Sequence, residues 1–391
     1  MTREEVFLPG ATIGVMGGGQ LGRMFAIAAR RMGYRVHIFS PEDNGPAAQL
    51  ADFSTVACYE DKEAVTQFAR AVDVITFEFE NIPRETVEWV SRERLRRPRG
   101  EIMVIVQNRL REKEFLQGGG FPIAPFRRVT DGASFRNALK AIGRPAILKS
   151  AAFGYDGKGQ QRIDKNTQLD TVWASRGEEE CVLEGVIDFE KEISVIVARG
   201  LNGATAVFPV CENFHRHHIL DATLGPAQID EQVARAAREL AREIAVKLEL
   251  IGLLAVEMFL TPAGNLIVNE LAPRPHNSGH WTIEGCVTSQ FEQHVRAVCG
   301  LPLGQTTLLR PTAMVNLLGD AWSQGEPNWS SALAEPNVHL HLYGKAEPRL
   351  RRKMGHLPAV GDTIALAAAS VLRARQRLAP SENRDRVGAR A

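Results

Sequence analysis

Residues 153–160 combine three glycines with one acidic and one basic side chain, a composition that suits the binding of a phosphate. Without their side chains, the glycines let the backbone bend tightly and bring its N–H groups against an anion. Asp156 and Lys158 lie between these glycines, and Lys149 ends the strand-like run that precedes them. A cation there suits a nucleotide phosphate. Taken alone, the stretch is equally typical of a surface hairpin with solvated charges.

A second stretch places two carboxylates on a predicted β-hairpin. Residues 252–260 and 265–271 flank a segment with the composition of a turn. Symmetric pairing about the turn sets Glu257 opposite Val268, which makes Glu257 and Glu270 diagonal neighbours on one face. Carboxylates that converge on a buried face raise each other's pKa unless a cation neutralises them. Because the ligands are oxygens and a phosphate is expected nearby, the sequence predicts Mg²⁺, with Mn²⁺ as the second choice.

Directly after this hairpin comes a polar loop that two prolines stiffen. It contains Arg274, His276, Asn277, Ser278 and His280. Rigid polar loops position substrates. Each histidine alone is as typical of a structural hydrogen bond.

The chain begins with a pattern typical of a parallel α/β domain. A short apolar strand, residues 11–16, leads into a glycine turn, residues 17–22, then a helix and a second strand. The turn matches G-x-G-x-x-G only formally, because Ser40 and Pro41 stand where a dinucleotide-binding domain has an acidic residue. We therefore favour a Rossmann-like domain whose glycine turn holds a smaller phosphorylated ligand, and a bound dinucleotide is the alternative.

A further strand of this domain ends in carboxylates. Residues 72–77 run into Glu78 and Glu80, at the edge of an open parallel sheet where ligands bind. A solvated strand end is the alternative. Residues 102–106 are predicted to form a last short strand, before a domain boundary near Asn108.

Beyond that boundary the sequence is richer in β-strand patterns. Strands are predicted over residues 181–187, 192–197, 204–211, 252–260, 265–271, 313–318 and 338–343, and a helix over residues 230–248. A basic run follows at residues 345–353. We divide the chain into three domains, residues 1–107, 108–300 and 301–391, and expect a frayed tail beyond Pro380.

The composition is that of an ordinary enzyme, with 391 residues, 44% of them hydrophobic and 24% charged. A net charge of +1 gives no reason to expect nucleic acid or an anionic membrane as a partner. We see no leader-like segment and no apolar run near the ~20 residues of a membrane helix, so we expect a cytoplasmic protein. Five scattered cysteines argue against disulfides and structural zinc. The basic cluster at residues 92–99 is interpreted as a solvated helix end.

Four motifs together resemble one enzyme family. They are GGGQLGRM at residues 17–24, GYDGKGQ at 154–160, NELAPRPHNSGH at 269–280 and RKMGH at 352–356. In sequence and order they closely resemble the N5-carboxyaminoimidazole ribonucleotide synthetases, the ATP-grasp enzymes of microbial purine synthesis, and the resemblance runs from Thr12 to Leu378. It implies an α/β and α+β fold of ATP-grasp architecture, with a Rossmann-like N-terminal domain, a central ATP-grasp domain and a small β-rich C-terminal domain.

The resemblance also implies roles for individual residues. Arg109 and Lys149 would hold ATP phosphates under the loop of residues 154–160, in which Asp156 and Lys158 would act on the aminoimidazole substrate. The implied ATP-binding residues are Arg109, Lys149, Gly154, Tyr155, Asp156, Gly157, Lys158, Gly159, Gln160, Glu184, Gly185, Val186, Ile187, Glu192, His215, Asn269 and Glu270. The implied substrate-binding residues are Gln20, Glu78, His276, Asn277, Ser278, Lys345 and Arg352. Glu257 and Glu270 are the implied metal ligands.

The reaction implied by the resemblance joins bicarbonate to 5-aminoimidazole ribonucleotide at the expense of ATP, through carboxyphosphate, and we expect Arg274 to hold that intermediate. Family habit implies a homodimer. Another ATP-grasp carboxylase or a formate-dependent glycinamide ribonucleotide transformylase is the alternative ligase, and a nucleotide-binding regulator or an oxidoreductase is the alternative from another class. Two departures concern Asn108, where the family commonly has aspartate, and Leu350-Arg351, where it often has Pro-Gly.

Overall fold

The computed structural model describes residues 5–152, 159–176 and 179–379. The predictions for Gly154, Tyr155, Asp156, Gly157 and Lys158 therefore lie outside the described residues.

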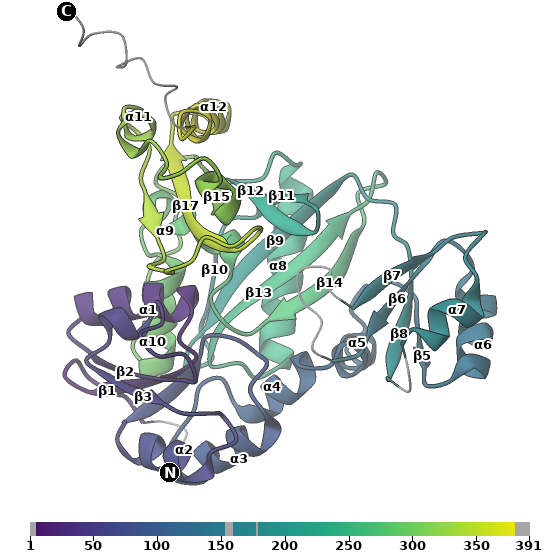
Figure 1. Cartoon of the computed structure of the whole chain (residues 1–391), viewed down its shortest axis with the longest axis horizontal. Helices are drawn as coiled ribbons and strands as arrows, with labels where there is room; N and C mark the ends of the chain where they lie inside the picture. The colour runs from purple at the N-terminus through teal and green to yellow at the C-terminus, as the bar shows by residue number, and fades with distance from the viewer. Residues whose placement is uncertain (1–4, 153–158, 177–178, 380–391) are drawn as a thin grey trace, which may run out of the picture.

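The N-terminal part folds around a parallel sheet with the strand order β3-β2-β1-β4 (Figure 1). Its elements are β1 (Thr12–Met16), α1 (Gln20–Arg31), β2 (Arg35–Ser40), η1 (Ala48–Leu50), β3 (Phe53–Val56), α2 (Lys62–Arg70), β4 (Val74–Phe77), α3 (Arg84–Glu93) and α4 (Gly100–Val106). β1, β2 and β4 are short apolar runs buried by helices on both faces, as in other parallel sheets, while the edge strand β3 is largely exposed. This arrangement brings the glycine turn after β1 and the carboxylates after β4 to one edge of the sheet.

Two predictions for this part are wrong. Residues 102–106 form helix α4, because a short apolar run does not distinguish a strand from a buried helix. The basic cluster at residues 92–99 is not a solvated helix end throughout, since Arg97 is only 1% exposed. Its guanidinium donates to the carbonyl oxygens of Val298 and Glu5, both at 2.7 Å, and so ties this domain to the carboxyl end of a helix far along the chain.

A second, smaller sheet has the strand order β5-β8-β6-β7. It follows α5 (Arg109–Gly118) and consists of β5 (Phe126–Val129), β6 (Ala146–Ser150), β7 (Gln160–Ile163) and β8 (Cys181–Gly185), with α6 (Gly132–Ile142) and α7 (Leu169–Ala174). Both helices pack against this sheet through one apolar cluster (Figure 1). The sheet and its helices form a separate lobe beside the large sheet.

The large sheet joins nine strands in the described part of the chain, in the order β14-β13-β9-β11-β12-β15-β17-β16, with β10 paired to β9. Its strands are β9 (Lys191–Arg199), β10 (Thr205–Val207), β11 (Cys211–Arg216), β12 (Ile219–Gly225), β13 (Gly252–Leu260), β14 (Leu266–Ala272), β15 (Thr312–Leu318), β16 (His341–Leu342) and β17 (Lys353–Val360). The C-terminal strands thus continue the central sheet, because β15 pairs with β12. The strand predicted over residues 204–211 is interrupted after Val207, and the one over residues 338–343 is confined to β16.

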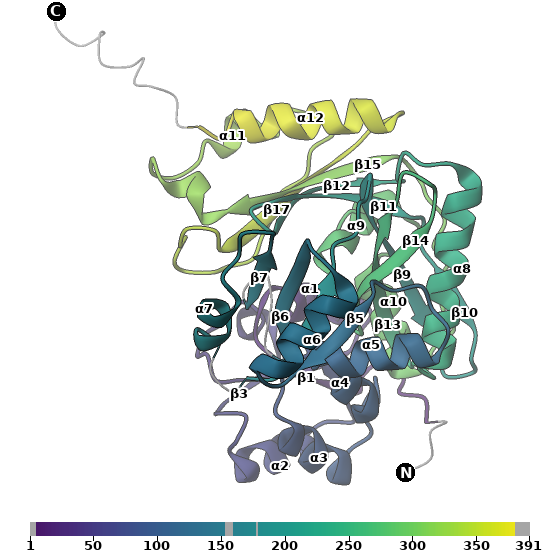
Figure 2. The ribbon, with the colours of Figure 1, turned by 90° about the vertical axis from the view of Figure 1, so that its right-hand side faces the viewer.

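Helices cover this sheet at several places. They are α8 (Glu231–Lys247), η2 (Asn277–Gly279), α9 (Thr282–Gly285), α10 (Gln290–Cys299), η3 (Gly319–Trp322), α11 (Trp329–Leu333) and α12 (Ile364–Gln376). The predicted helix over residues 230–248 is confirmed as α8, and Asp230 caps its first turn. In Figure 2, α8 runs along β9 and β13, while α12 lies over β15 and β17. None of the described helices has the length and apolar character needed to cross a membrane.

Candidate active site

Glu257 and Glu270 face each other directly across the hairpin of β13 and β14. The predicted diagonal arrangement is wrong, because the pairing shifts between Glu257 and Met258 and leaves Asn269 as an extra residue. Such a β-bulge redirects side chains locally. Directly opposed residues have Cβ atoms about 4.5–5.5 Å apart, closer than diagonal ones. The two carboxylates therefore converge more tightly than the sequence predicts.

The electrostatics of this pair call for a cation. Burial, and then the charge of Glu270, raise the pKa of Glu257 to about 7. The Nε2 atom of His276 lies 3.2 Å from Glu257 Oε1, but burial, and then the charge of Arg274, lower the pKa of His276 well below its usual value. That imidazole therefore brings little compensating charge. Two facing carboxylates with all-oxygen donors suit Mg²⁺, so the residues present fit the predicted metal.

Two lysines converge on a buried glutamate beside this hairpin. Lys149 Nζ lies 2.9 Å from Glu184 Oε2, and Lys113 Nζ lies 3.3 Å from Glu184 Oε1. Burial by itself raises the pKa of Glu184, but the two lysines outweigh it and the pKa is lowered. Gly185, Val186 and Ile187 follow Glu184 at the end of β8.

Arg109 opens helix α5 next to the smaller sheet, and its backbone N–H donates to the carbonyl of Ala151 at 2.7 Å. Asn108 caps the helix, because its side chain accepts from the N–H groups of Leu110 and Arg111. The carboxamide thus does what a carboxylate at an N-cap does, so this departure from the family leaves the helix start intact. On the same lobe, Gly159 and Gln160 lead into β7, where Gln160 pairs with Lys149.

Helix α5 contacts both the smaller-sheet lobe and the β13–β14 hairpin of the large sheet. Glu112 Oε1 accepts a 2.5 Å hydrogen bond from Leu271 N on the β13–β14 hairpin, while Lys113 pairs with Glu184 on the smaller sheet. Burial, and then the charge of Glu270, raise the pKa of Glu112 to about 8. Sequence analysis missed both residues, because adjacent charges on a predicted helix look like a solvated face.

Glu192 and His215 are brought together by neighbouring strands β9 and β11. His215 Nδ1 lies 2.7 Å from Glu192 Oε2. Burial lowers the pKa of His215, but the Glu192 carboxylate outweighs it, so the pKa is raised.

The glycine turn after β1 is occupied by a carboxylate of the chain itself. Glu78 accepts hydrogen bonds from the backbone N–H groups of Gly19, at 2.5 Å, and Gly22, at 2.6 Å. At Gly17, with φ of 117°, an added Cβ would lie 2.2 Å from Glu78 Cγ, so a side chain there would displace the glutamate. The N–H groups of Gly19 and Gly22 are therefore taken by Glu78 and are not available to a phosphate, and the phosphorylated ligand near this turn stays a prediction.

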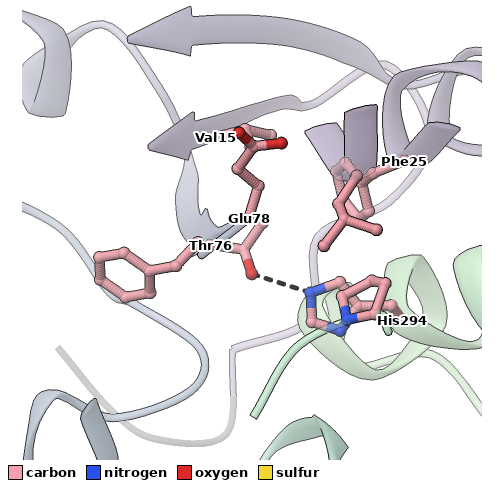
Figure 3. A pocket seen from close by; sticks show the side chains of 8 residues that line it. Val15, Phe25, Thr76, Glu78 and His294 are labelled. Carbon is pink, nitrogen blue, oxygen red and sulfur yellow. Dashed lines mark hydrogen bonds between the residues drawn. The ribbon is translucent and has the colours of Figure 1, made fainter. Parts of the chain in front are cut away.

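Below this turn the domain packs closely on α10. His294 Nε2 lies 3.0 Å from Thr76 Oγ1, and Val15 and Phe25 line the same slot (Figure 3). Burial lowers the pKa of His294 to about 3, so this histidine is neutral. The slot is too narrow for a water molecule. On another side of the turn, the C-terminal segment that carries Lys345 contacts Gln20.

Four of the implied substrate-binding residues meet on that side. Lys345 Nζ donates to Gln20 Oε1 at 2.9 Å and to the carbonyl of Lys353 at 2.6 Å. Burial, and then the charge of Arg352, lower the pKa of Lys345 to about 8, while Glu78 opposes this shift. Arg352 donates to the carbonyl of Glu347 and lies 3.8 Å from a carboxylate oxygen of Glu42. The basic run is thus not wholly solvated, although the default interpretation of such a run is a solvated surface.

The polar loop after β14 is held rigidly. The carboxamide of Gln290 accepts from the N–H of His276 at 2.9 Å and donates to its carbonyl at 2.7 Å. Ser278 accepts a hydrogen bond from Ser194, and His276 Nδ1 lies 2.8 Å from Ser278 Oγ. Asn277 is buried, and its carboxamide has no hydrogen-bond partner within the described residues. Arg274 pairs with Glu80 from the other domain.

Comparison with known proteins agrees with this geometry. A model of the ATP-grasp domain matches residues 114–291, one of the ribonucleotide synthetase preATP-grasp domain matches 10–107, and one of the phosphoribosylaminoimidazole carboxylase C-terminal domain matches 312–370. Two lobes with lysines and paired carboxylates between them, preceded by a parallel sheet, define an ATP-grasp ligase.

Individual relatives specify the family. The chain is 45% identical to the N5-carboxyaminoimidazole ribonucleotide synthase of Bacillus subtilis over 90% of its length and 92% of that protein, and 45% identical to that of Brucella melitensis over 90% and 97%. A crystal structure of an N5-carboxyaminoimidazole ribonucleotide synthetase with ADP matches with a TM-score of 0.90 at 43% identity, over 95% of this chain and 97% of that one. The chain belongs to the N5-carboxyaminoimidazole ribonucleotide synthase family. The synthase from Aspergillus clavatus in complex with ADP and 5-aminoimidazole ribonucleotide matches with a TM-score of 0.86 at 30% identity, over 94% and 99%.

Proposed function

We propose that this chain catalyses the ATP-dependent carboxylation of 5-aminoimidazole ribonucleotide with bicarbonate, which gives N5-carboxyaminoimidazole ribonucleotide, ADP and phosphate in purine biosynthesis. Family membership supports the reaction, as does the relative that binds ADP and 5-aminoimidazole ribonucleotide together. The observation that carries the proposal is the facing pair Glu257 and Glu270, which helix α5 connects to Lys149: Glu112 accepts from Leu271 N of the hairpin, and Lys113 and Lys149 both pair with Glu184. Opposed carboxylates near lysines suit a metal-bound polyphosphate.

The ATP site of this proposal lies between the two lobes. Lys149 and Arg109 bind phosphate oxygens from the small-sheet side, and the chain from Glu184 to Ile187 contacts the adenine. Glu192, whose carboxylate already orients His215, binds the ribose hydroxyls. Glu257 and Glu270, with Asn269 beside them, would hold Mg²⁺, which would neutralise phosphate charge. Mn²⁺ carries the same ligand preference for oxygen.

The ribonucleotide site lies where the glycine turn meets the C-terminal strands. Lys345 and Arg352 bind the 5′-phosphate, an arginine offering paired donors and a lysine a point charge. Gln20 and Glu78 reach the ribose from the other side. His276, Asn277 and Ser278 complete the site, and the buried carboxamide of Asn277 has no hydrogen-bond partner within the described residues, which leaves a donor and an acceptor for a ligand to pair.

The chemistry has two steps. A bicarbonate oxygen attacks the γ-phosphorus of ATP, the bond to ADP breaks, and carboxyphosphate forms beside Arg274. The exocyclic amine of the ribonucleotide then forms an N–C bond with the carboxyl carbon as phosphate leaves, and the amine loses a proton. Asp156 and Lys158, which lie outside the described residues, remain predicted to act on this amine. Carboxyphosphate hydrolyses readily, so water must be excluded.

Two finer expectations belong to the same proposal. A homodimer is expected from the resemblance of the motifs to their family. A cytoplasmic location is expected because ATP and purine intermediates are the substrates.

The test measures ADP and carboxylated product separately, with each substrate supplied alone and all together. We expect product only when ATP, Mg²⁺, bicarbonate and 5-aminoimidazole ribonucleotide are all present. Turnover of glycinamide ribonucleotide with formate in their place would overturn the proposal in favour of the formate-dependent transformylase.

A further inference from the structure

Glu80 reaches from the N-terminal domain to Arg274 of the polar loop. Arg274 Nε donates to Glu80 Oε2 at 2.5 Å, and Arg274 Nη2 donates to Glu80 Oε1 at 3.0 Å. Both side chains are largely buried, at 18% and 16% exposure. The carboxylate therefore grips the guanidinium from its side, through Nε and one terminal nitrogen.

This side-on grip decides which donors Arg274 has left. A guanidinium carries five N–H donors. Glu80 takes one on Nε and one on Nη2, and the carbonyl of Pro275 takes one on Nη1 at 3.2 Å. One N–H on each terminal nitrogen remains, and within the described residues neither has a further acceptor. The free end of the guanidinium thus presents a pair of donors, which matches two oxygens of a planar anion.

The backbone that carries Glu80 is itself fixed. Gln107 Nε2 donates to the carbonyl of Glu80 at 2.6 Å and to the carbonyl of Ile82 at 2.7 Å. Burial alone would raise the pKa of Glu80, but Arg274 outweighs it and the pKa is lowered, so the carboxylate is ionised. A charged and anchored partner keeps the arginine in one orientation. The charges of Glu270 and Glu78 also act on Arg274, so the guanidinium lies near one predicted metal ligand and near the carboxylate of the glycine turn.

We propose that Glu80 is a positioning residue for carboxylation, which holds Arg274 side-on so that its free end grips two oxygens of bicarbonate and of the carboxyphosphate formed from it. The proposal rests on the proposed function, because that function supplies the planar anion. Glu80 itself does not touch the anion, since two carboxylates repel. Because Glu80 occupies the Nε and Nη2 edge, the end of the guanidinium formed by the two terminal nitrogens is left for the anion.

The test is Glu80→Gln, measured with the full set of substrates in buffers depleted of carbon dioxide. The amide keeps one acceptor oxygen but replaces the other with a donor. The guanidinium of Arg274 therefore loses one of its two hydrogen bonds to residue 80 and rotates away from its orientation. A misplacement of 1 Å in a reacting group can cost about 10²-fold in rate. We expect the Michaelis constant for bicarbonate to rise by about tenfold or more and kcat to fall, while the Michaelis constant for ATP stays within about twofold.

A matched control exists on the surface. Arg70 Nε donates to Glu93 Oε2 at 3.0 Å and Arg70 Nη2 to Glu93 Oε1 at 3.2 Å, which repeats the same atom pattern between α2 and α3. Glu93→Gln should leave every kinetic constant unchanged.

A double-variant cycle adds a second experiment. Glu80→Gln should add little to the effect of Arg274→Lys, because a lysine has no pair of N–H groups that a carboxylate could hold in a fixed orientation.

Several results would overturn the proposal. Normal bicarbonate kinetics in Glu80→Gln, with only a lower melting temperature, would make Glu80 a domain contact. A raised Michaelis constant for the ribonucleotide alone would assign Glu80 to that site. Wild-type chain that forms no bicarbonate-dependent product would overturn the proposed function, and the role of Glu80 with it, whereas an active wild type with an unaffected variant would overturn Glu80 alone.

Discussion

The two ends of the site give their buried carboxylates different partners. At the glycine turn, Glu78 receives two backbone N–H donors and lies near the positive charges of Arg274 and Lys345, although burial outweighs these partners and raises its pKa. At the hairpin, Glu257 faces another glutamate, and burial together with that neighbour raises its pKa to about 7. The first end bonds its carboxylate with the chain's own groups, whereas the second offers two facing carboxylates whose repulsion the proposed cation would offset. A glycine-rich turn is thus no sign of a bound phosphate when a nearby strand supplies a carboxylate.

The largest expected effect tests the carboxylate pair of the hairpin. Glu270→Ala should reduce product formation by more than about 100-fold, because even residues that merely orient metal ligands cost up to that amount. The same variant should melt at a higher temperature than the wild type without metal, since it removes a buried repulsion. Steady-state assays and calorimetry with a chelator measure the two effects. Full activity in the folded variant would contradict the metal assignment, and Glu270→Gln serves as the isosteric control.

A somewhat smaller effect concerns the cationic side of the glycine turn. Arg352→Gln should raise the Michaelis constant for 5-aminoimidazole ribonucleotide by a factor that corresponds to about 2–5 kcal/mol, with ATP binding unchanged.

Wild-type affinity for the ribonucleotide should fall as pH rises through about 8, because Lys345 then loses its charge. In Arg352→Gln this break should move to higher pH, since the Arg352 charge helps to lower that pKa. A break that stays in place would remove Lys345 from the phosphate site.

These same regions show which features of the fold and the site could be predicted from the sequence. The hairpin, the helix α8 and the βαβ opening follow from patterns within single segments. The bulge at Asn269 does not, because it depends on how two strands pair, and a shift by one residue changes which side chains face each other. The Glu80–Arg274 pair joins residues 194 positions apart, and Lys113 looks like any charge on a helix. Such contacts arise only from packing between domains.

A third, more moderate effect concerns Glu78, whose removal should destabilise the protein, whereas removal of Glu270 at the hairpin should stabilise it. Glu78→Ala should lower the free energy of unfolding by about 1–3 kcal/mol, because it leaves buried N–H groups at Gly19 and Gly22 unpaired. The emptied turn should then behave as an anion site, so inorganic phosphate should raise the melting temperature of the variant more than that of the wild type. Thermal scans with phosphate and with chloride at equal ionic strength measure this. Equal responses in both chains would contradict the account of the turn.

The last effect, on stability alone, concerns Glu112, the third carboxylate near the hairpin. Its pKa of about 8 lies above the usual value of 4.5, so its contribution to stability is fully present below pH 4.5 and is lost as pH rises through about 8. An unfolded glutamate ionises at about 4.5, so the wild type loses stability relative to Glu112→Gln, which keeps an acceptor for Leu271 N, as pH rises from about 4.5 to about 8. At pH 7 the variant should therefore already be the more stable of the two, by about 1–3 kcal/mol, and above pH 8 the difference should stay constant because Glu112 is then ionised in both states. Urea titrations at pH 6, 7 and 9 in a chelator would reveal this divergence, with Glu114→Gln on the same helix as the control. Parallel stability curves for wild type and Glu112→Gln across that range would show that Glu112 is ionised throughout, and the hairpin end would then carry even more negative charge for a cation to offset.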